Sequence, residues 1–297
     1  MDINGNNSKP KPRISRRDFL KLSKTTGLTM LFAAAGRAYI SQGWSDWLDV
    51  TQVRLALPRL PGSFSGFRIA QVSDIHMGGW MTIERLRQVF DTVNKIAPDI
   101  VAITGDFMHS YDSRVIYDQE LLVLEAELKE LATKFEILAV LGNRDYWADA
   151  SAILGMLQRC GVKPLVNEIH EVQRGKDFYH IAGVDDVIAG QSRLDDVVAE
   201  LPDKGCAILM AHEPDFADVS AATGRFDLQI SGHSHGGQVN LPLIGAPVLP
   251  QLAHKYPQGL YRVGEMYQYT NRGVGMTEPF IRINCRPEIT VFTLESK

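Results

Sequence analysis

The residues of this 297-residue chain that could do chemistry are Asp, Asn and His side chains, each placed just after a short apolar run. In chain order their segments read DxH, GD, GN, H and GHxH, and the polar members are Asp74, His76, Asp106, Asn143, His212, His233 and His235. Carboxylate, amide and imidazole groups suit divalent Mn, Fe, Zn or Ni better than Cu(I) or an iron–sulfur cluster. The set therefore predicts a divalent metal site without a thiol ligand.

Taken singly, each of these residues has an ordinary structural explanation. A histidine after a strand is often only hydrogen-bonded, Asp106 after Gly105 can make a turn, and Asn143 can cap a helix. No single structural role of this sort explains why all five segments occur in this order, each at the end of a predicted strand. Strand-like spacing in DxH and HxH would point both side chains to one side, and the preceding glycines would permit sharp turns and close approach.

The elements that must position these residues follow from apolar periodicity. Short buried strands are predicted at residues 67–72, 100–104, 137–141, 207–211 and 228–230. Amphipathic helices are predicted at residues 82–97, 117–133 and 150–160. This alternation indicates an α/β layered core, and ligands in such folds gather at the carboxyl ends of strands. The polar residues should therefore converge on one crevice.

The last third of the chain has a different pattern. It is dense in Gly and Pro up to Gly264 and then gives β-like runs at residues 266–270 and 288–294, with no long helix. A GxG at residues 273–275 lacks the strand, helix and third glycine of a dinucleotide loop. We expect one catalytic domain over residues 41–297.

Composition excludes several classes of protein. A chain with 45% hydrophobic and 22% charged residues is globular, and three widely spaced cysteines provide neither a disulfide framework nor a CxxC zinc site. Residues 1–40 carry eight Lys and Arg against two Asp and Glu. The remainder of the chain carries 23 Lys and Arg against 33 Asp and Glu, and is therefore acidic. An acidic body argues against nucleic acid as a partner.

Residues 1–40 have the layout of an export signal. The sequence SRRDFLK at residues 15–21 precedes an apolar run of about 11 residues, shorter than the ~20 needed to span a bilayer. The segment resembles a twin-arginine signal, which implies the twin-arginine translocation machinery as a partner and a location in the periplasm or at the outer face of the cytoplasmic membrane. A basic amphipathic arm on a cytoplasmic protein is the alternative. Cleavage after Ala35 or Ala38, or retention as a short anchor, remains open.

The metal-site segments resemble the motifs of calcineurin-like metallophosphoesterases, and the likeness extends over about residues 55–294. The sequences GFRIAQVSDIH at 66–76, GHSHGG at 232–237 and RPEITVFTL at 286–294 further resemble the branch of exported bacterial phosphoesterases typified by YkuE and YaeI. The resemblance implies a four-layer α/β/β/α sandwich of two mixed sheets flanked by helices. It also implies a dinuclear centre, with the assignment that one metal takes Asp74, His76 and His235, the other takes Asn143, His212 and His233, and Asp106 bridges them.

The implied activity is hydrolysis of small-molecule or lipid phosphoesters, with diesters favoured over monoesters. Two cations ~3.5–4 Å apart lower the pKa of a bridging water toward ~7, and the resulting hydroxide attacks phosphorus in line without a covalent enzyme intermediate. A membrane surface is a further candidate partner.

One position departs from the family pattern. The family's GNHD is GNRD here, so Arg144 stands where a histidine is expected, beside Asp145; both are candidate catalytic residues. Arginine cannot act as a general acid near neutral pH, which forfeits on the order of 10² to 10⁴ in rate with a poor leaving group. It can still bind a phosphate oxygen. Alternatively, Arg144 turns outward and pairs with Asp145 or Asp149.

Two other functions remain as alternatives. One is hydrolysis of a lipid pyrophosphate of the UDP-diacylglucosamine type, a cytosolic reaction against which an export signal counts. The other is a metal-binding envelope protein whose catalysis Arg144 has weakened, against which the presence of all seven predicted ligands argues.

Overall fold

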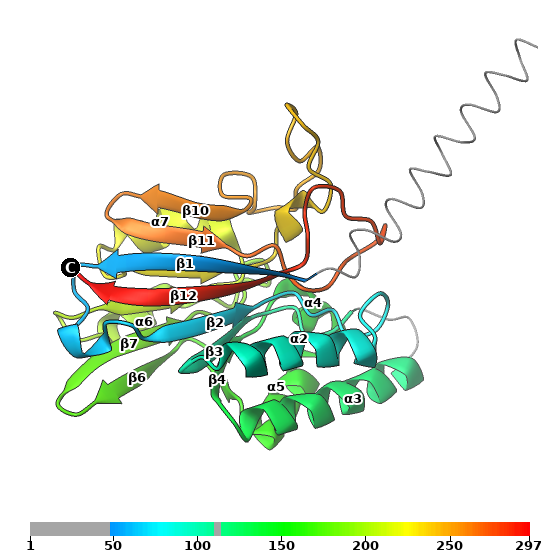
Figure 1. Cartoon of the computed structure of the whole chain (residues 1–297), viewed down its shortest axis with the longest axis horizontal. Coiled ribbons are helices and arrows are strands. Elements are labelled where there is room, and N and C mark those ends of the chain that lie inside the picture. Colours follow the sequence, from blue (N-terminus) through cyan, green and yellow to red (C-terminus); the bar gives the residue numbers. More distant parts are fainter. Residues whose placement is uncertain (1–47, 110–113) are drawn as a thin grey trace, which may run out of the picture. The chain divides into compact units, whose positions relative to one another are not determined.

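The computed structural model describes residues 48–109 and 114–297 (Figure 1). The predicted export signal at residues 1–40 lies outside the described residues. Among the helices of the described ranges, none has both the length and the apolar character needed to cross a membrane.

Two six-stranded mixed sheets form the centre of the described part. The first has the order β1 (Asp49–Leu57), β12 (Glu288–Ser296), β2 (Arg68–Val72), β3 (Ile100–Thr104), β4 (Glu136–Val140) and β5 (Lys163–Pro164). The second has the order β10 (Gly259–Val263), β11 (Met266–Thr270), β9 (Leu228–Ser231), β8 (Ala207–Met210), β7 (Asp177–Gly183) and β6 (Glu168–Arg174). Strands β2 to β5 run parallel, as do β7, β8, β9 and β11, whereas β12 is antiparallel to β2.

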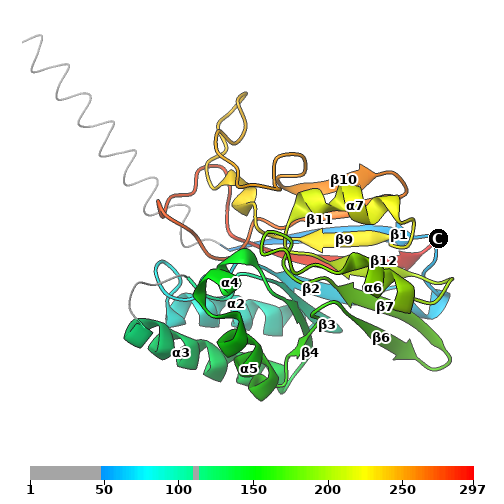
Figure 2. The same cartoon turned by 180° about the vertical axis from the view of Figure 1, so that it is seen from behind.

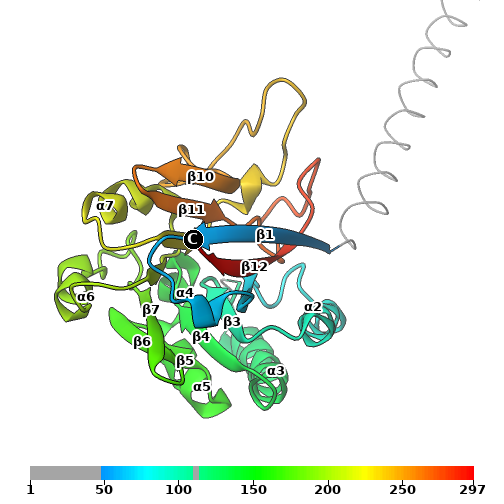
Figure 3. The same cartoon turned by 60° about the vertical axis from the view of Figure 1, so that its left-hand side comes forward.

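Helices cover the outer faces of both sheets. On the first sheet lie α2 (Ile83–Ile96), α3 (Arg114–Ala132) and α5 (Ala150–Cys160), and on the second lie α6 (Leu194–Glu200) and α7 (Ala217–Ala222) (Figures 2 and 3). The short elements are α4 (Asn143–Ala148), η1 (Gly62–Phe64), η2 (Pro214–Phe216) and η3 (His235–Gly237).

Three buried apolar clusters fill the spaces between these layers. In β3, Val101 and Ile103 pack in the cluster beneath α2, α3 and α5, whereas Ile100 and Ala102 pack between the two sheets. A third cluster lies beneath α6 and α7. Because both faces of a central strand are buried, its sequence is a continuous apolar run rather than an alternating one. The layers confirm the predicted four-layer α/β/β/α sandwich.

The strands and helices that the sequence predicted around the metal segments are present, within a few residues at their ends. The helix predicted at 82–97 is α2, where Thr82 caps the first turn by accepting the Arg85 N–H and Ala97 ends the helix with φ 49°. The strands β1, β5, β6, β7 and β10 and the helices α4, α6 and α7 were not predicted. Strand β6 is mostly polar and lies at a sheet edge, and β1 alternates half-buried and exposed residues, so neither has the apolar run of a central strand.

Candidate metal centre

Six of the seven predicted ligands form two compact buried groups beyond the strand ends. Asp74, His76 and His235 form the first, and Asp106, His212 and His233 form the second; within each group the ligand atoms lie within 4.8 Å of one another. In the first group Nε2 of His76 is 3.0 Å from Nε2 of His235. In the second, Asp106 Oδ2 is 3.4 Å from Nε2 of His212.

Asp106 lies between the two groups. Its Oδ2 is also 3.5 Å from Nε2 of His76, which belongs to the first group. The same carboxylate oxygen can therefore reach ions held in either group. This placement suits the bridging role that the family resemblance implies for Asp106, which remains a prediction.

The backbone, rather than strand alternation, turns these side chains inward. Five of the ligands adopt the left-handed conformation, with φ between 48° and 66°: Asp74, His76, Asp106, His233 and His235. Non-glycine residues seldom adopt this conformation, and it gathers at functional sites where surrounding structure enforces it. The interpretation of DxH and HxH as strand-like spacing was therefore wrong, because both segments leave the strand before their ligands.

Two glycines allow the loops of the site to approach each other. A Cβ atom on Gly142 would overlap Asp106 Oδ1, and a Cβ on Gly232 would overlap Ser73 Oγ and Asp74 Oδ2. A side chain at either glycine would push apart the loops that follow the two neighbouring strands. The close approach that the sequence predicted for these two glycines is confirmed.

Hydrogen bonds behind the histidines decide which ring nitrogen faces the site. Nδ1 of His212 is 2.7 Å from the carbonyl oxygen of Thr104, and Nε2 of His233 is 2.8 Å from that of Gln251. A carbonyl accepts only from a protonated nitrogen, so His212 presents Nε2 and His233 presents Nδ1. Such outer contacts fix the tautomer and orientation of metal-binding histidines.

Two buried polar atoms indicate that this site fits divalent ions. Oδ1 of Asn143 has no hydrogen-bond partner among the described residues, and Nε2 of His212 has only a long contact with Asp106 Oδ2, at 3.4 Å. A buried polar atom without a partner costs about 1–3 kcal/mol. A cation in the second group would satisfy both atoms, and Asn143 would complete that group as the sequence predicts.

Burial also sets the protonation of the ligands. It lowers the pKa of His76 to about 3 and lowers the pKa values of His233 and His235, so these rings are neutral, as metal ligands must be. Burial raises the pKa of Asp74 to about 6. For His212, burial opposes protonation, but the Asp106 carboxylate outweighs it and raises the pKa of that ring well above its usual value. A bound cation would displace that proton.

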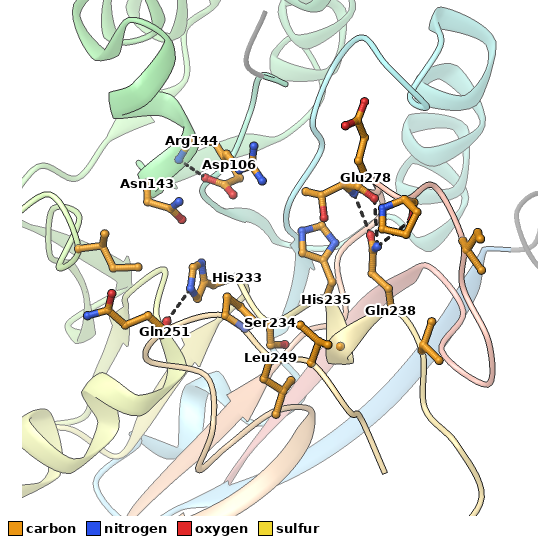
Figure 4. Close-up of a pocket in the computed structure, with 18 of the residues that line it drawn as sticks. Asp106, Asn143, Arg144, His233, Ser234, His235, Gln238, Leu249, Gln251 and Glu278 are labelled. Atoms are coloured by element: carbon orange, nitrogen blue, oxygen red, sulfur yellow. Dashed lines mark hydrogen bonds between the residues drawn. The ribbon is translucent and has the colours of Figure 1, made fainter. Parts of the chain in front are cut away.

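Arg144 lines the cleft in front of the two groups, together with Asp106 and His233 (Figure 4). Its backbone N–H donates to Asp106 Oδ1 at 2.9 Å, and its guanidinium carbon lies 5.1 Å from the ring centroid of Trp147. Asp149, one partner of the predicted outward pair, instead accepts from Arg114 at 3.0 Å and caps α5. Arg144 thus lies at the cleft, and its contact with a phosphate stays a prediction.

Asp145 faces away from the cleft and into the backbone. Its carboxylate accepts hydrogen bonds from the N–H groups of Gly142, Asp106 and Phe107 at 2.8–2.9 Å, and from that of Met108 at 3.4 Å. This side chain joins the loop after β3 to the loop after β4. Asp145 is thus a positioning residue in this structure.

Arg282 supports the candidate site from behind, and the sequence reasoning missed it. It is fully buried behind His235, with Nη2 3.4 Å from that ring's Nδ1, and it donates to the carbonyl oxygens of Gly273 and Gly275. Gly273 packs directly against Asp74, so the discounted GxG supports the metal loop. The sequence carried no signal for Arg282, because its contacts depend on how the loops fold together.

Comparison with known families and proteins agrees with this geometry. The family model described as "Calcineurin-like phosphoesterase" matches residues 67–237, more than half of the chain and all seven predicted ligands. The chain belongs to this family. It is thus a metallophosphoesterase, an enzyme that hydrolyses phosphoester bonds.

Individual members of the calcineurin-like phosphoesterase family are similar over nearly the whole chain. "Uncharacterized metallophosphoesterase YkuE" of Bacillus subtilis is 32% identical, covering 96% of this chain and 99% of that protein. "Phosphodiesterase YaeI" of Escherichia coli is 29% identical, covering 95% and 99%. "Transmembrane protein with metallophosphoesterase domain" of Danio rerio is 31% identical, covering 92% and 63%. These relatives confirm the branch that the sequence resembles.

Proposed function

We propose that the chain is a phosphodiesterase that uses two divalent metal ions and acts outside the cytoplasmic membrane. The observation that carries the proposal is the pair of buried ligand groups with Asp106 Oδ2 between them. When bound, two cations in such a site supply a nucleophile at neutral pH and neutralise charge on the phosphate.

The side chains of this chain would act in separate roles. The neutral His76, His233 and His235 hold the ions without first losing a proton. Arg144 reaches the cleft from the side of α4 and can donate two hydrogen bonds to a phosphate oxygen, which offsets charge that develops during attack. Because Arg144 cannot give up a proton, the leaving group should be one that departs as an anion.

Two observations favour a diester substrate. The relative YaeI, similar over 95% of this chain, is named a phosphodiesterase. A diester also has one substituent that leaves and another that remains, and the cleft, about 500 Å³ in volume, is larger than a phosphate alone requires. The identity of the ions, among Mn, Fe, Zn and Ni, is best decided by metal analysis.

The proposed location rests on the sequence of residues 15–35, where paired arginines precede an apolar run. Export would be tested by fractionating cells that express the full chain and a variant with Arg16→Lys and Arg17→Lys. The wild type should reach the envelope fraction, and the variant should remain in the cytoplasm. Equal distribution would overturn export by the twin-arginine route.

The activity is tested by Mn²⁺-supported hydrolysis of bis-p-nitrophenyl phosphate. His235→Ala should lower kcat/KM by more than about 10²-fold, since loss even of outer contacts to a metal ligand costs 10–100-fold. His254→Ala, which changes an exposed histidine outside the cleft, is the matched control and should retain activity. Metal binding without hydrolysis would instead support the alternative of a weakened metal-binding envelope protein.

A further inference from the structure

The cleft in front of the metal groups has one polar end and one apolar wall. The polar end contains Asp106, Asn143 and Arg144 (Figure 4). Five apolar residues that the metal centre does not use also line the cleft, and we call them the apolar wall: Val239, Pro247, Leu249, Pro250 and Ile281. The polar residues Gln238, Gln251, Thr277 and Glu278 line the same cleft. A phosphate held at the polar end would therefore have a substituent running along an apolar surface.

The apolar wall continues into a protruding loop. Residues 241–250 extend away from the sheets between β9 and β10 (Figure 1). At its tip Leu243 is fully exposed, and Ile244 and Val248 are 73% and 76% exposed. No Asp, Glu, Lys or Arg occurs from residue 236 to 253. Single exposed apolar side chains are ordinary, but a contiguous set beside a cleft marks an interaction site.

Other segments add apolar side chains around the same cleft. Trp147, which lines the cleft from α4, is 61% exposed. Phe280 is 38% exposed and lies in the loop between Pro279 and Ile281, both of which line the cleft. The cleft is therefore bordered by exposed hydrophobic residues from three separate parts of the sequence.

We infer that the substrate is a lipid phosphoester, whose hydrocarbon chain lies against the apolar wall while Leu243 and Ile244 enter the lipid surface that supplies it. This inference rests on the proposed function, because the metal centre must hold the phosphate. The absence of charge over residues 236–253 matches a hydrocarbon phase better than a protein or nucleic acid partner. Each methylene placed on the wall should increase binding about fourfold.

Chain selectivity tests the wall. The full chain is assayed with Mn²⁺ on methyl p-nitrophenyl phosphate and dodecyl p-nitrophenyl phosphate, both below micelle-forming concentrations. The esters share a leaving group, so their kcat/KM ratio reports only the chain, and we expect the dodecyl ester to be preferred by at least about tenfold. Leu249→Asn should lower this ratio several-fold, and Leu122→Asn, an exposed leucine of α3, should not.

Each outcome of this assay is decisive. A ratio near one, or a ratio that Leu249→Asn leaves unchanged, would overturn the inference while leaving the phosphodiesterase intact. Hydrolysis of neither ester would overturn the proposed function, and the inference with it. Melting curves of both variants verify that they remain folded.

Vesicle flotation tests the loop without catalysis. Vesicles of phosphatidylethanolamine and phosphatidylglycerol are used at the concentration that binds half of the wild type. The variant Leu243→Asn with Ile244→Asn should float several-fold less than wild type. The control, Val115→Asn with Leu122→Asn, removes two exposed apolar residues of α3, 67% and 65% exposed, and should float as the wild type does. Because all of these proteins keep residues 1–47, equal flotation of variant and control would overturn insertion of the loop.

Discussion

The backbone N–H of Asp106 donates a hydrogen bond to Oδ2 of Asp145 at 2.9 Å, so the loop that carries the central ligand is attached to the start of α4. The same oxygen accepts from Gly142, and Oδ1 accepts from Phe107 and Met108. A side chain that touches neither the cleft nor a ligand atom thus holds the geometry of the site.

Asp145→Asn should destabilise the protein and weaken metal binding. The amide would place an NH₂ group against two backbone donors, which costs about 3 kcal/mol in the free energy of unfolding. Metal affinity should fall about 10–100-fold, as it does when outer contacts of a metal site are lost. Chemical denaturation and Mn²⁺ titration measure the two effects.

Asp149→Asn is the matched control for that variant. Asp149 caps α5 by accepting the Ala152 N–H, and asparagine caps a helix as well as aspartate does. Its ion pair with Arg114 is largely exposed, so we expect a change below about 1 kcal/mol. Equal effects of the two substitutions would contradict the positioning role of Asp145.

Arg144→Ala should lower kcat/KM on bis-p-nitrophenyl phosphate by about 10–100-fold, because a charge-assisted donor to the phosphate is lost. Stability should change little, since the side chain is partly exposed at the cleft. Steady-state kinetics with a melting curve separates the two effects. An unchanged kcat/KM would show that the guanidinium does not contact the substrate.

Arg144→His should change the dependence of rate on the leaving group. An imidazole can donate a proton to a departing alkoxide, which arginine cannot. The rate of hydrolysis of esters with poor leaving groups should therefore rise by up to about 10²-fold. Esters of p-nitrophenol, which leaves as an anion, should gain little. Rates on a series of aryl and alkyl phosphodiesters give the slope of log rate against the pKa of the leaving group. A slope equal to that of the wild type would refute this role for the position.

Metal affinity should fall as the pH is lowered through about 6. Burial raises the pKa of Asp74 to about 6, so this ligand is ionised above that pH and protonated below it. Protons therefore compete with the metal on the acid side, and affinity should drop by up to about tenfold per pH unit for each proton taken up. Isothermal titration with Mn²⁺ from pH 7.5 to 5 measures this, and a constant affinity over that range would contradict it.

Gly275→Ala should disturb the metal loop from behind. A Cβ atom at this position would overlap the carbonyl oxygens of Asp74 and Ile75. Such crowding costs typically 1–3 kcal/mol, and we expect metal affinity to fall together with the melting temperature. Gly62→Ala, where a Cβ meets nothing within 4 Å, is the control. Equal melting temperatures for the two variants would show that the loop carrying Asp74 accommodates the added methyl group.

The amino-acid sequence alone was enough to predict the candidate ligands and the elements that carry them. A ligand after each short apolar run marks the carboxyl end of a strand, and this signal is local, since it needs only the run and the residue that follows it. The same holds for α2, where the spacing of Leu86, Phe90 and Val93 and the cap at Thr82 lie within one segment. Local signals of this kind also carried the family resemblance.

Only the tertiary structure decided what depends on contacts between distant segments. Strand β1 pairs with β12 across most of the chain, Asp145 turns toward backbone amides after β3, and Arg282 lies behind His235. None of these contacts leaves a periodic trace in the sequence. The left-handed backbone at Asp74 likewise persists because surrounding packing enforces it against the residue's own preference. The residue types thus predicted the chemistry of the site, and packing between distant segments sets the geometry in which that chemistry can occur.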